Sequence, residues 1–86
     1  MDNKTELMII TMEECGELTQ ACSKVLRTDF SKETIEDLTK EVADVMCMIE
    51  LMKEHLFIKN SDIVQGIQNK RDKLKIWSNL INRNKS

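Results

Sequence analysis

The chain has 86 residues, 41% of them hydrophobic and 33% charged, with a formal net charge of −2 at pH 7. This length fits one small domain, and the composition is typical of a folded, helix-rich protein rather than a disordered one. With two glycines and no proline or tyrosine, the sequence argues against an all-β fold built on many tight turns.

The first predicted helix covers about residues 5–26. Its apolar residues recur with the helical period of about 3.6 residues: Leu7, Ile10, Leu18, Ala21 and Val25. Asn3 and Glu6 have the spacing of an N-cap residue and its capping-box partner. Residues 27–33 interrupt the apolar period, so we expect them to connect this helix to the next.

The second predicted helix begins near Thr34 and ends at about residue 56, and the third covers about residues 61–81 with Ser61 as its N-cap. The second has an apolar stripe of Ile35, Leu38, Val42, Val45, Ile49 and Met52. The third has a stripe of Ile63, Ile67, Leu74, Trp77 and Ile81. Three helices with short connections predict a single all-α domain over residues 1–86, folded as an antiparallel bundle.

The apolar stripes are wider than one small bundle can bury, and they are rich in methionine, especially Met46, Met48 and Met52. We therefore expect homo-oligomerisation, to a dimer or a tetramer, to complete a four-helix-type core. No apolar run approaches the roughly 20 residues of a membrane span, and no secretory leader is evident. These observations predict a cytoplasmic protein with no membrane partner.

The charges are unevenly distributed along the chain. Residues 1–59 carry seven basic and thirteen acidic side chains, whereas residues 70–86 carry six basic and one acidic. This asymmetry indicates either pairing of the two parts or an anion bound between them. Nucleic-acid binding is disfavoured because most of the chain is acidic and aromatic residues are not interleaved with the basic ones.

Three cysteines and one histidine, with no CxxC spacing, do not supply the ligands of a zinc site. The cysteines are instead expected to be reduced, small, buried side chains.

Two carboxylates of the first predicted helix lie on or beside its apolar face. At about 100° per residue, Glu14 falls between Ile10 and Leu18. Glu17 falls at the margin of the same face, and Glu13 points away from it. A carboxylate on a core-facing stripe loses hydration, at a cost of several kcal/mol unless it is compensated.

The second predicted helix repeats this pattern with Glu41 and Asp44, which lie among the methionines of its stripe. If the two stripes face each other, four carboxylates converge. Their mutual repulsion then requires cations, and ligands that offer only oxygen select hard divalent ions, Mg²⁺ or Mn²⁺. The alternative interpretation is that these four residues are ordinary surface charges, because acidic residues at i, i+3 are common on solvated helix faces.

The third predicted helix places Lys70 between Leu74 and Trp77 on its apolar stripe, with Lys73 at the border. Lys70 is expected to extend its amine to water, to pair with a carboxylate, or to hold a phosphate. Trp77 is expected either to pack in the core or to stack on a base. Carboxylates, a divalent metal and a lysine together are the groups that phosphoryl chemistry uses.

Glu13, Glu14 and Glu17, followed by Glu41 and Asp44, form an EExxE…ExxD pattern. It resembles the signature of the MazG-like all-α nucleotide pyrophosphohydrolases. The segments EECGELTQACSK and LTKEVADVMCMIELM are similar to short, single-domain, phage-type members, and NKRDKLKIWSNL is similar to the basic third helix of that family. The resemblance covers roughly residues 6–80.

The resemblance implies Mg²⁺-dependent hydrolysis of a nucleoside triphosphate, NTP or dNTP, to the monophosphate and pyrophosphate, with Mn²⁺ as a substitute metal. It assigns metal binding and catalysis to Glu14, Glu17, Glu41 and Asp44. A metal-bound carboxylate would orient and deprotonate the water, and Glu13 would at most contact these ligands. It also implies a site inside a four-helix core made by paired chains and, for a phage-encoded protein, the host cytoplasm.

The candidates for substrate binding lie on the first and third predicted helices. Lys70 and Lys73 are candidates for the triphosphate, Lys24 is a further one near Glu17 in helical phase, and Trp77 is a candidate for the base.

Two alternative functions remain open from the sequence. Phosphoribosyl-ATP pyrophosphohydrolase would use the same metal and reaction on another substrate, and a non-enzymatic helical oligomerisation module would account for the size and the methionine-rich stripe. The base and sugar preference, the activity on alarmones and the number of metal ions also stay open.

Overall fold

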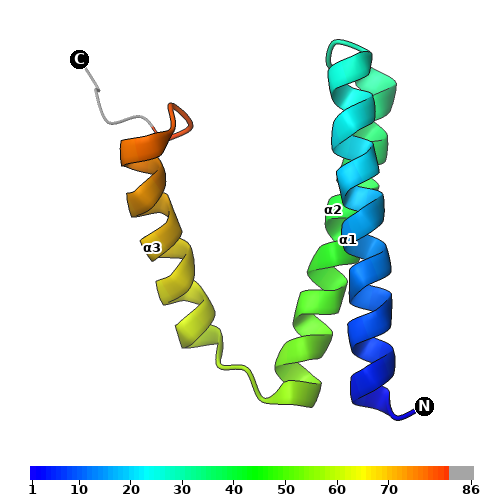
Figure 1. The fold of residues 1–86 in the computed structure, drawn as a ribbon, viewed down its shortest axis with the longest axis vertical. Coiled ribbons are helices and arrows are strands. Elements are labelled where there is room, and N and C mark those ends of the chain that lie inside the picture. The colour runs from blue at the N-terminus through cyan, green and yellow to red at the C-terminus, as the bar shows by residue number, and fades with distance from the viewer. Residues whose placement is uncertain (82–86) are drawn as a thin grey trace.

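The computed structural model describes residues 1–81, which form three helices: α1 (Asn3–Arg27), α2 (Lys32–Leu56) and α3 (Asn60–Trp77). No strand occurs in this part of the chain, which confirms the all-α class. Helices α1 and α2 run antiparallel and side by side, while α3 stands apart (Figure 1). Over the described residues, no helix combines the length and the apolar character needed to cross a membrane.

Helix α1 is capped by Asp2, one residue before the predicted cap at Asn3. The Asp2 carboxylate accepts a hydrogen bond from the backbone N–H of Thr5 at 2.7 Å and another from its hydroxyl at 3.1 Å. These two bonds hold the pKa of Asp2 below its ordinary value. Asn3 is the first helical residue and Glu6 lies in the first turn, so the predicted capping box is wrong.

A short connection turns the chain between α1 and α2. Asp29 and Phe30 have left-handed backbone conformations, with φ of 52° and 61°, and the Phe30 N–H donates to the Val25 carbonyl at 2.9 Å. The Ser31 hydroxyl then caps α2 by accepting from the Thr34 N–H at 3.3 Å. Helix α2 therefore begins at Lys32, slightly earlier than its apolar period indicates.

The small core lies between α1 and α2 and contains Leu7, Ala21, Val25 and Met48. Its α1 members, Leu7, Ala21 and Val25, are separated by 14 and by four residues, which places them on one face of the helix. Ile35 and Val42, which the sequence places on the α2 stripe, are 38% and 44% exposed. They form part of an apolar surface that α1 does not cover.

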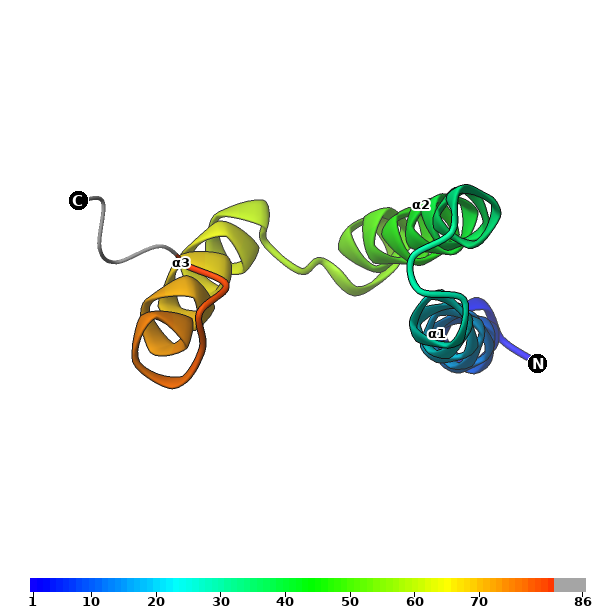
Figure 2. The ribbon, with the colours of Figure 1, turned by 90° about the horizontal axis from the view of Figure 1, so that it is seen from above.

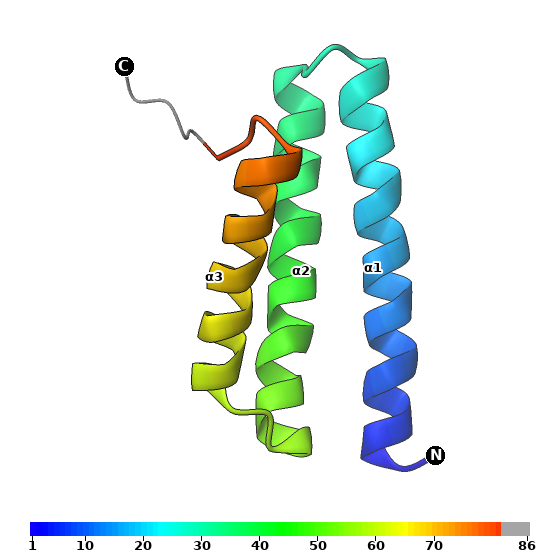
Figure 3. The same ribbon diagram turned by 60° about the vertical axis from the view of Figure 1, so that its left-hand side comes forward.

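Helix α3 does not pack closely on α1 or α2, so the predicted three-helix bundle is not formed within one chain. Viewed from above, α3 lies to one side of the α1–α2 pair (Figure 2). It projects beside α2 in Figure 3, but Figure 1 shows the two helices diverging from their connection. The radius of gyration is 15.9 Å, whereas a compact chain of this length has about 12 Å.

The ends of α3 also differ from those predicted. Lys59 occupies the N-cap position without a side-chain hydrogen bond, and Ser61 lies inside the helix. The helix ends at Trp77, before the predicted end near residue 81, because Ser78 adopts extended backbone. Trp77 is 83% exposed, so its predicted packing in a core does not occur within the chain.

The cysteines Cys15, Cys22 and Cys47 are free, as predicted, but all three are exposed, so their predicted burial is wrong.

Candidate metal centre

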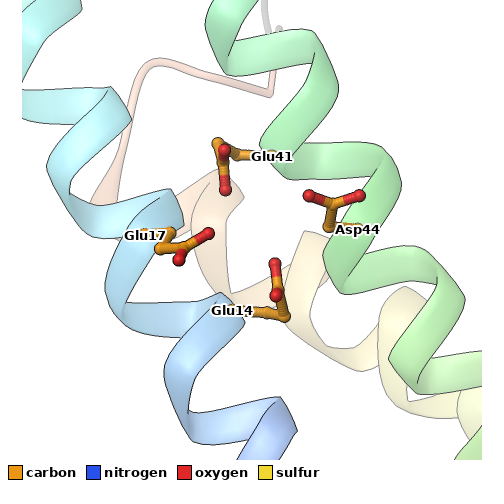
Figure 4. A group of neighbouring side chains, drawn as sticks. All are labelled: Glu14, Glu17, Glu41 and Asp44. Carbon is orange, nitrogen blue, oxygen red and sulfur yellow. The ribbon is translucent and has the colours of Figure 1, made fainter.

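Four carboxylates from two helices meet midway along the α1–α2 pair. Glu14 and Glu17 come from α1, Glu41 and Asp44 come from α2, and their side chains point toward one another (Figure 4). One oxygen from each lies within 4.8 Å of those of the other three. Each pair is separated by one helical turn, and the antiparallel packing of the helices makes the two pairs face each other, as the spacing predicts.

Glu14 and Glu41 occupy the line of side chains that packs one helix against the other. Both residues are half-buried. Glu14 Oε2 and Glu41 Oε2 are buried, and neither has a hydrogen-bond partner among residues 1–81. Because a buried acceptor without a partner loses its hydration uncompensated, this arrangement destabilises the fold unless another group binds there.

The electrostatics of the cluster follow from this burial. Burial raises the pKa of Glu14 above its ordinary value, and the negative charges of Glu17, Asp44 and Glu13 raise it further. Burial also raises the pKa of Glu41, with contributions from the charges of Glu17, Asp44 and Glu14. The cluster therefore concentrates negative charge where it is poorly hydrated, and a bound cation relieves that cost.

The residues present fit a hard divalent cation. All four donors are carboxylate oxygens, and no cysteine or histidine among residues 1–81 belongs to the cluster. Oxygen donors of this kind suit Mg²⁺ and Mn²⁺ rather than zinc. Glu17 and Asp44 are exposed, so the half of the cluster that they provide is open to a ligand from solution.

A cavity of about 270 Å³ continues from the cluster toward the α1–α2 connection. Glu17 and Glu41 belong to both the cluster and the cavity. The other lining residues are Gln20, Ala21, Lys24, Thr34, Asp37 and Lys40. Lys24, a substrate-binding candidate from the sequence, therefore lies beside the carboxylates.

Lys40 lines the same cavity and was not among the predicted residues. The sequence gives little indication of this position, because Lys40 lies on the polar face of α2, away from its apolar stripe. Two patterns point to the cavity in retrospect. On α1, Gln20 and Lys24 continue the helix face of Glu17, and on α2, Thr34 and Asp37 precede Glu41 on its face.

The other predicted residues are not brought to the cluster. Glu13 is exposed and lies outside the group of four, although its charge affects Glu14. Lys70, Lys73 and Trp77 lie on α3, which does not pack on the helices that carry the carboxylates. Within one chain, these three side chains are exposed and remote from the cluster.

Comparisons with protein-family models, with curated proteins and with solved structures found no match.

Proposed function

We propose that this protein is a Mg²⁺-dependent nucleoside triphosphate pyrophosphohydrolase of the MazG-like all-α type, with Mn²⁺ as a substitute metal. The observation that carries the proposal is the convergence of Glu14, Glu17, Glu41 and Asp44, with two buried oxygens that lack a partner in the described chain. This is the arrangement that the EExxE and ExxD motifs require if both contribute to one metal centre.

The four carboxylates have different tasks in this proposal. The half-buried Glu14 and Glu41 anchor the metal between the helices, and the exposed Glu17 and Asp44 face the substrate. When bound, Mg²⁺ neutralises charge on the phosphate oxygens and lowers the pKa of water. Water adds to the α-phosphorus, the bond to the bridging oxygen breaks, and pyrophosphate leaves. A carboxylate of the cluster takes the proton from the water.

The proposal includes a homo-oligomer, supported by the apolar side chains that one chain leaves uncovered. Val42, Met46, Val64 and Ile67 are all 44% to 56% exposed. Exposed apolar side chains at helical spacing on two helices are typical of surfaces that pack against a partner. Association of two copies would complete a four-helix core, and packing of α3 from one copy against the α1–α2 pair of the other would bring Lys70 and Lys73 toward a metal centre.

The proposal is tested by incubating the protein with Mg²⁺ and a panel of ribo- and deoxyribonucleoside triphosphates, with chromatographic identification of the products. Monophosphate and pyrophosphate, lost with EDTA and in an Asp44→Asn variant, support it. Glu36→Gln is the matched control, since Glu36 is exposed on α2 outside the cluster and the cavity.

Two other results would change the proposal. Diphosphate and phosphate as products would contradict the assigned reaction. If no triphosphate is hydrolysed, phosphoribosyl-ATP is the next substrate to test, and inactivity on it as well would favour the oligomerisation module.

A further inference from the structure

The cavity beside the carboxylate cluster has the size and position of a subsite for part of the substrate. Its volume of about 270 Å³ is just below the roughly 300–1,000 Å³ of pockets that enclose whole small molecules. It opens from Glu17 and Glu41, and the small, buried Ala21 forms part of its wall. A chain of phosphates fits this space better than a complete nucleotide does.

Two lysines line this cavity without forming an ion pair. Lys24 and Lys40 share the lining with the carboxylates of Glu17, Asp37 and Glu41. Even so, neither lysine belongs to an ion pair among residues 1–81. The two ion pairs in this part of the chain are formed by Lys53 and Lys75. Both amines are therefore available to an anion that enters the cavity.

We propose that Lys24 and Lys40 form the subsite for the terminal phosphates of the substrate. This inference rests on the proposed function and deepens it by fixing the direction of the substrate. With the α-phosphate at the carboxylates, the β- and γ-phosphates extend toward the α1–α2 connection. The nucleoside then lies on the opposite side, toward Glu14 and Asp44, and pyrophosphate leaves from the lysine cavity.

Other features of the cavity modify its affinity for an anion. Thr34 places the first turn of α2 at the cavity, and the dipole of a helix favours negative charge at that end. Asp37 acts in the opposite direction, because its carboxylate lines the same space. The subsite is therefore expected to bind its anion more tightly when Asp37 is neutralised.

Calorimetric titration of the full chain with inorganic pyrophosphate in the presence of Mg²⁺ tests the subsite without requiring turnover. Lys24→Gln and Lys40→Gln are each expected to weaken binding about fivefold, the effect of losing one charge contact of an exposed lysine. Asp37→Asn is expected to tighten it. Lys4→Gln is the control, because Lys4 is exposed on α1 and does not line the cavity, and circular dichroism checks that every variant folds.

Kinetics provide the second measurement. Both lysine variants should raise the KM for the triphosphate with a smaller change in kcat. Pyrophosphate binding and KM that match the wild type in both lysine variants would overturn the subsite even if the enzyme is active. Lysine-dependent pyrophosphate binding by a protein that hydrolyses no nucleotide would instead support the subsite and reject the proposed function.

Discussion

Glu14 on α1 and Glu41 on α2 occupy equivalent positions between the two helices. Each buries one carboxylate oxygen that accepts no hydrogen bond from any group of residues 1–81. A hydrophobic residue at either place would pack the two helices together at no electrostatic cost. The fold thus gives up stability at the point where the four carboxylates meet. Such local conflicts between stability and chemistry are typical of functional sites.

The first prediction concerns the removal of one of these charges. Glu14→Gln should lower pyrophosphohydrolase activity by more than about a hundredfold, because a metal ligand is lost. The same change should raise the Tm of the metal-free protein, because it removes repulsion within the cluster. Activity assays and thermal unfolding in EDTA measure the two effects, with Glu36→Gln as the control. A variant with wild-type activity would contradict the assignment of Glu14.

The second prediction concerns metal binding to the folded state. A ligand at a hundredfold excess over its Kd stabilises a protein by about 2.7 kcal/mol. For a domain of this size, that corresponds to a rise in Tm of roughly 10–20 °C. Thermal unfolding with and without Mg²⁺ or Mn²⁺ measures the shift, which should vanish in Asp44→Asn. An unchanged Tm in the wild type at saturating metal would remove the support for a metal centre.

The third prediction is a pH dependence of the metal-free protein. The pKa values of Glu14 and Glu41 lie above their ordinary value of 4.5 in the folded chain, so the folded state binds these protons more tightly than the unfolded state. Their contribution is therefore favourable below about pH 4.5 and is lost as the pH rises through the raised values. In EDTA, the wild type should lose stability relative to a Glu14→Gln, Glu41→Gln double variant as the pH rises above the ordinary value of 4.5.

The comparison with the double variant isolates the two carboxylates from other titrating groups. Asp2 and Asp72 have lowered pKa values, so their contribution to stability is lost as the pH falls, the opposite trend. That loss occurs at pH values below their ordinary pKa of 3.8. Saturating Mg²⁺ should reverse the pH trend, because the metal requires ionised ligands. Parallel Tm profiles for the wild type and the double variant in EDTA would contradict the prediction.

The sequence predicts the carboxylate cluster because the two features that form it, the spacing within each helix and the short connection between them, are local in the chain. Glu14 and Glu17, like Glu41 and Asp44, are one turn apart, and a short connection makes their helices antiparallel. The position of Lys40 was missed because it depends on the register between the helices. That register is set at the α1–α2 connection, where the Phe30 N–H bonds to the Val25 carbonyl.

The position of α3 was not predictable in the same way. Its apolar stripe indicates a buried face but does not identify the surface that buries it. The chain enters α3 through Phe57, which has a left-handed φ of 55°, and Lys53 donates a hydrogen bond to Asn60 at 3.0 Å across the connection. These local contacts direct α3 away from α1 and α2, so Lys70 and Trp77 do not reach the cluster within one chain.

The last prediction is that a second copy covers the apolar surface of α2 and α3. Stable interfaces bury about 1,200–2,000 Å² in total, which requires contacts along much of a helix pair. Val42 and Ile67 are 44% and 55% exposed. Val42→Lys or Ile67→Lys should dissociate the assembly, because either change places a charge in that interface. Analytical ultracentrifugation measures the change in mass, and Ser23→Lys is the control because Ser23 is exposed and polar.

The same variants show whether assembly is needed for activity. Dissociation by Val42→Lys with its carboxylates intact should abolish hydrolysis if α3 must pack beside a metal centre to bring Lys70 and Lys73 there. A Lys70→Gln, Lys73→Gln double variant should then assemble normally but have a raised KM. Full activity in a protein that sedimentation shows to be monomeric would restrict the site to α1 and α2, and the lysines of α3 would have no part in it.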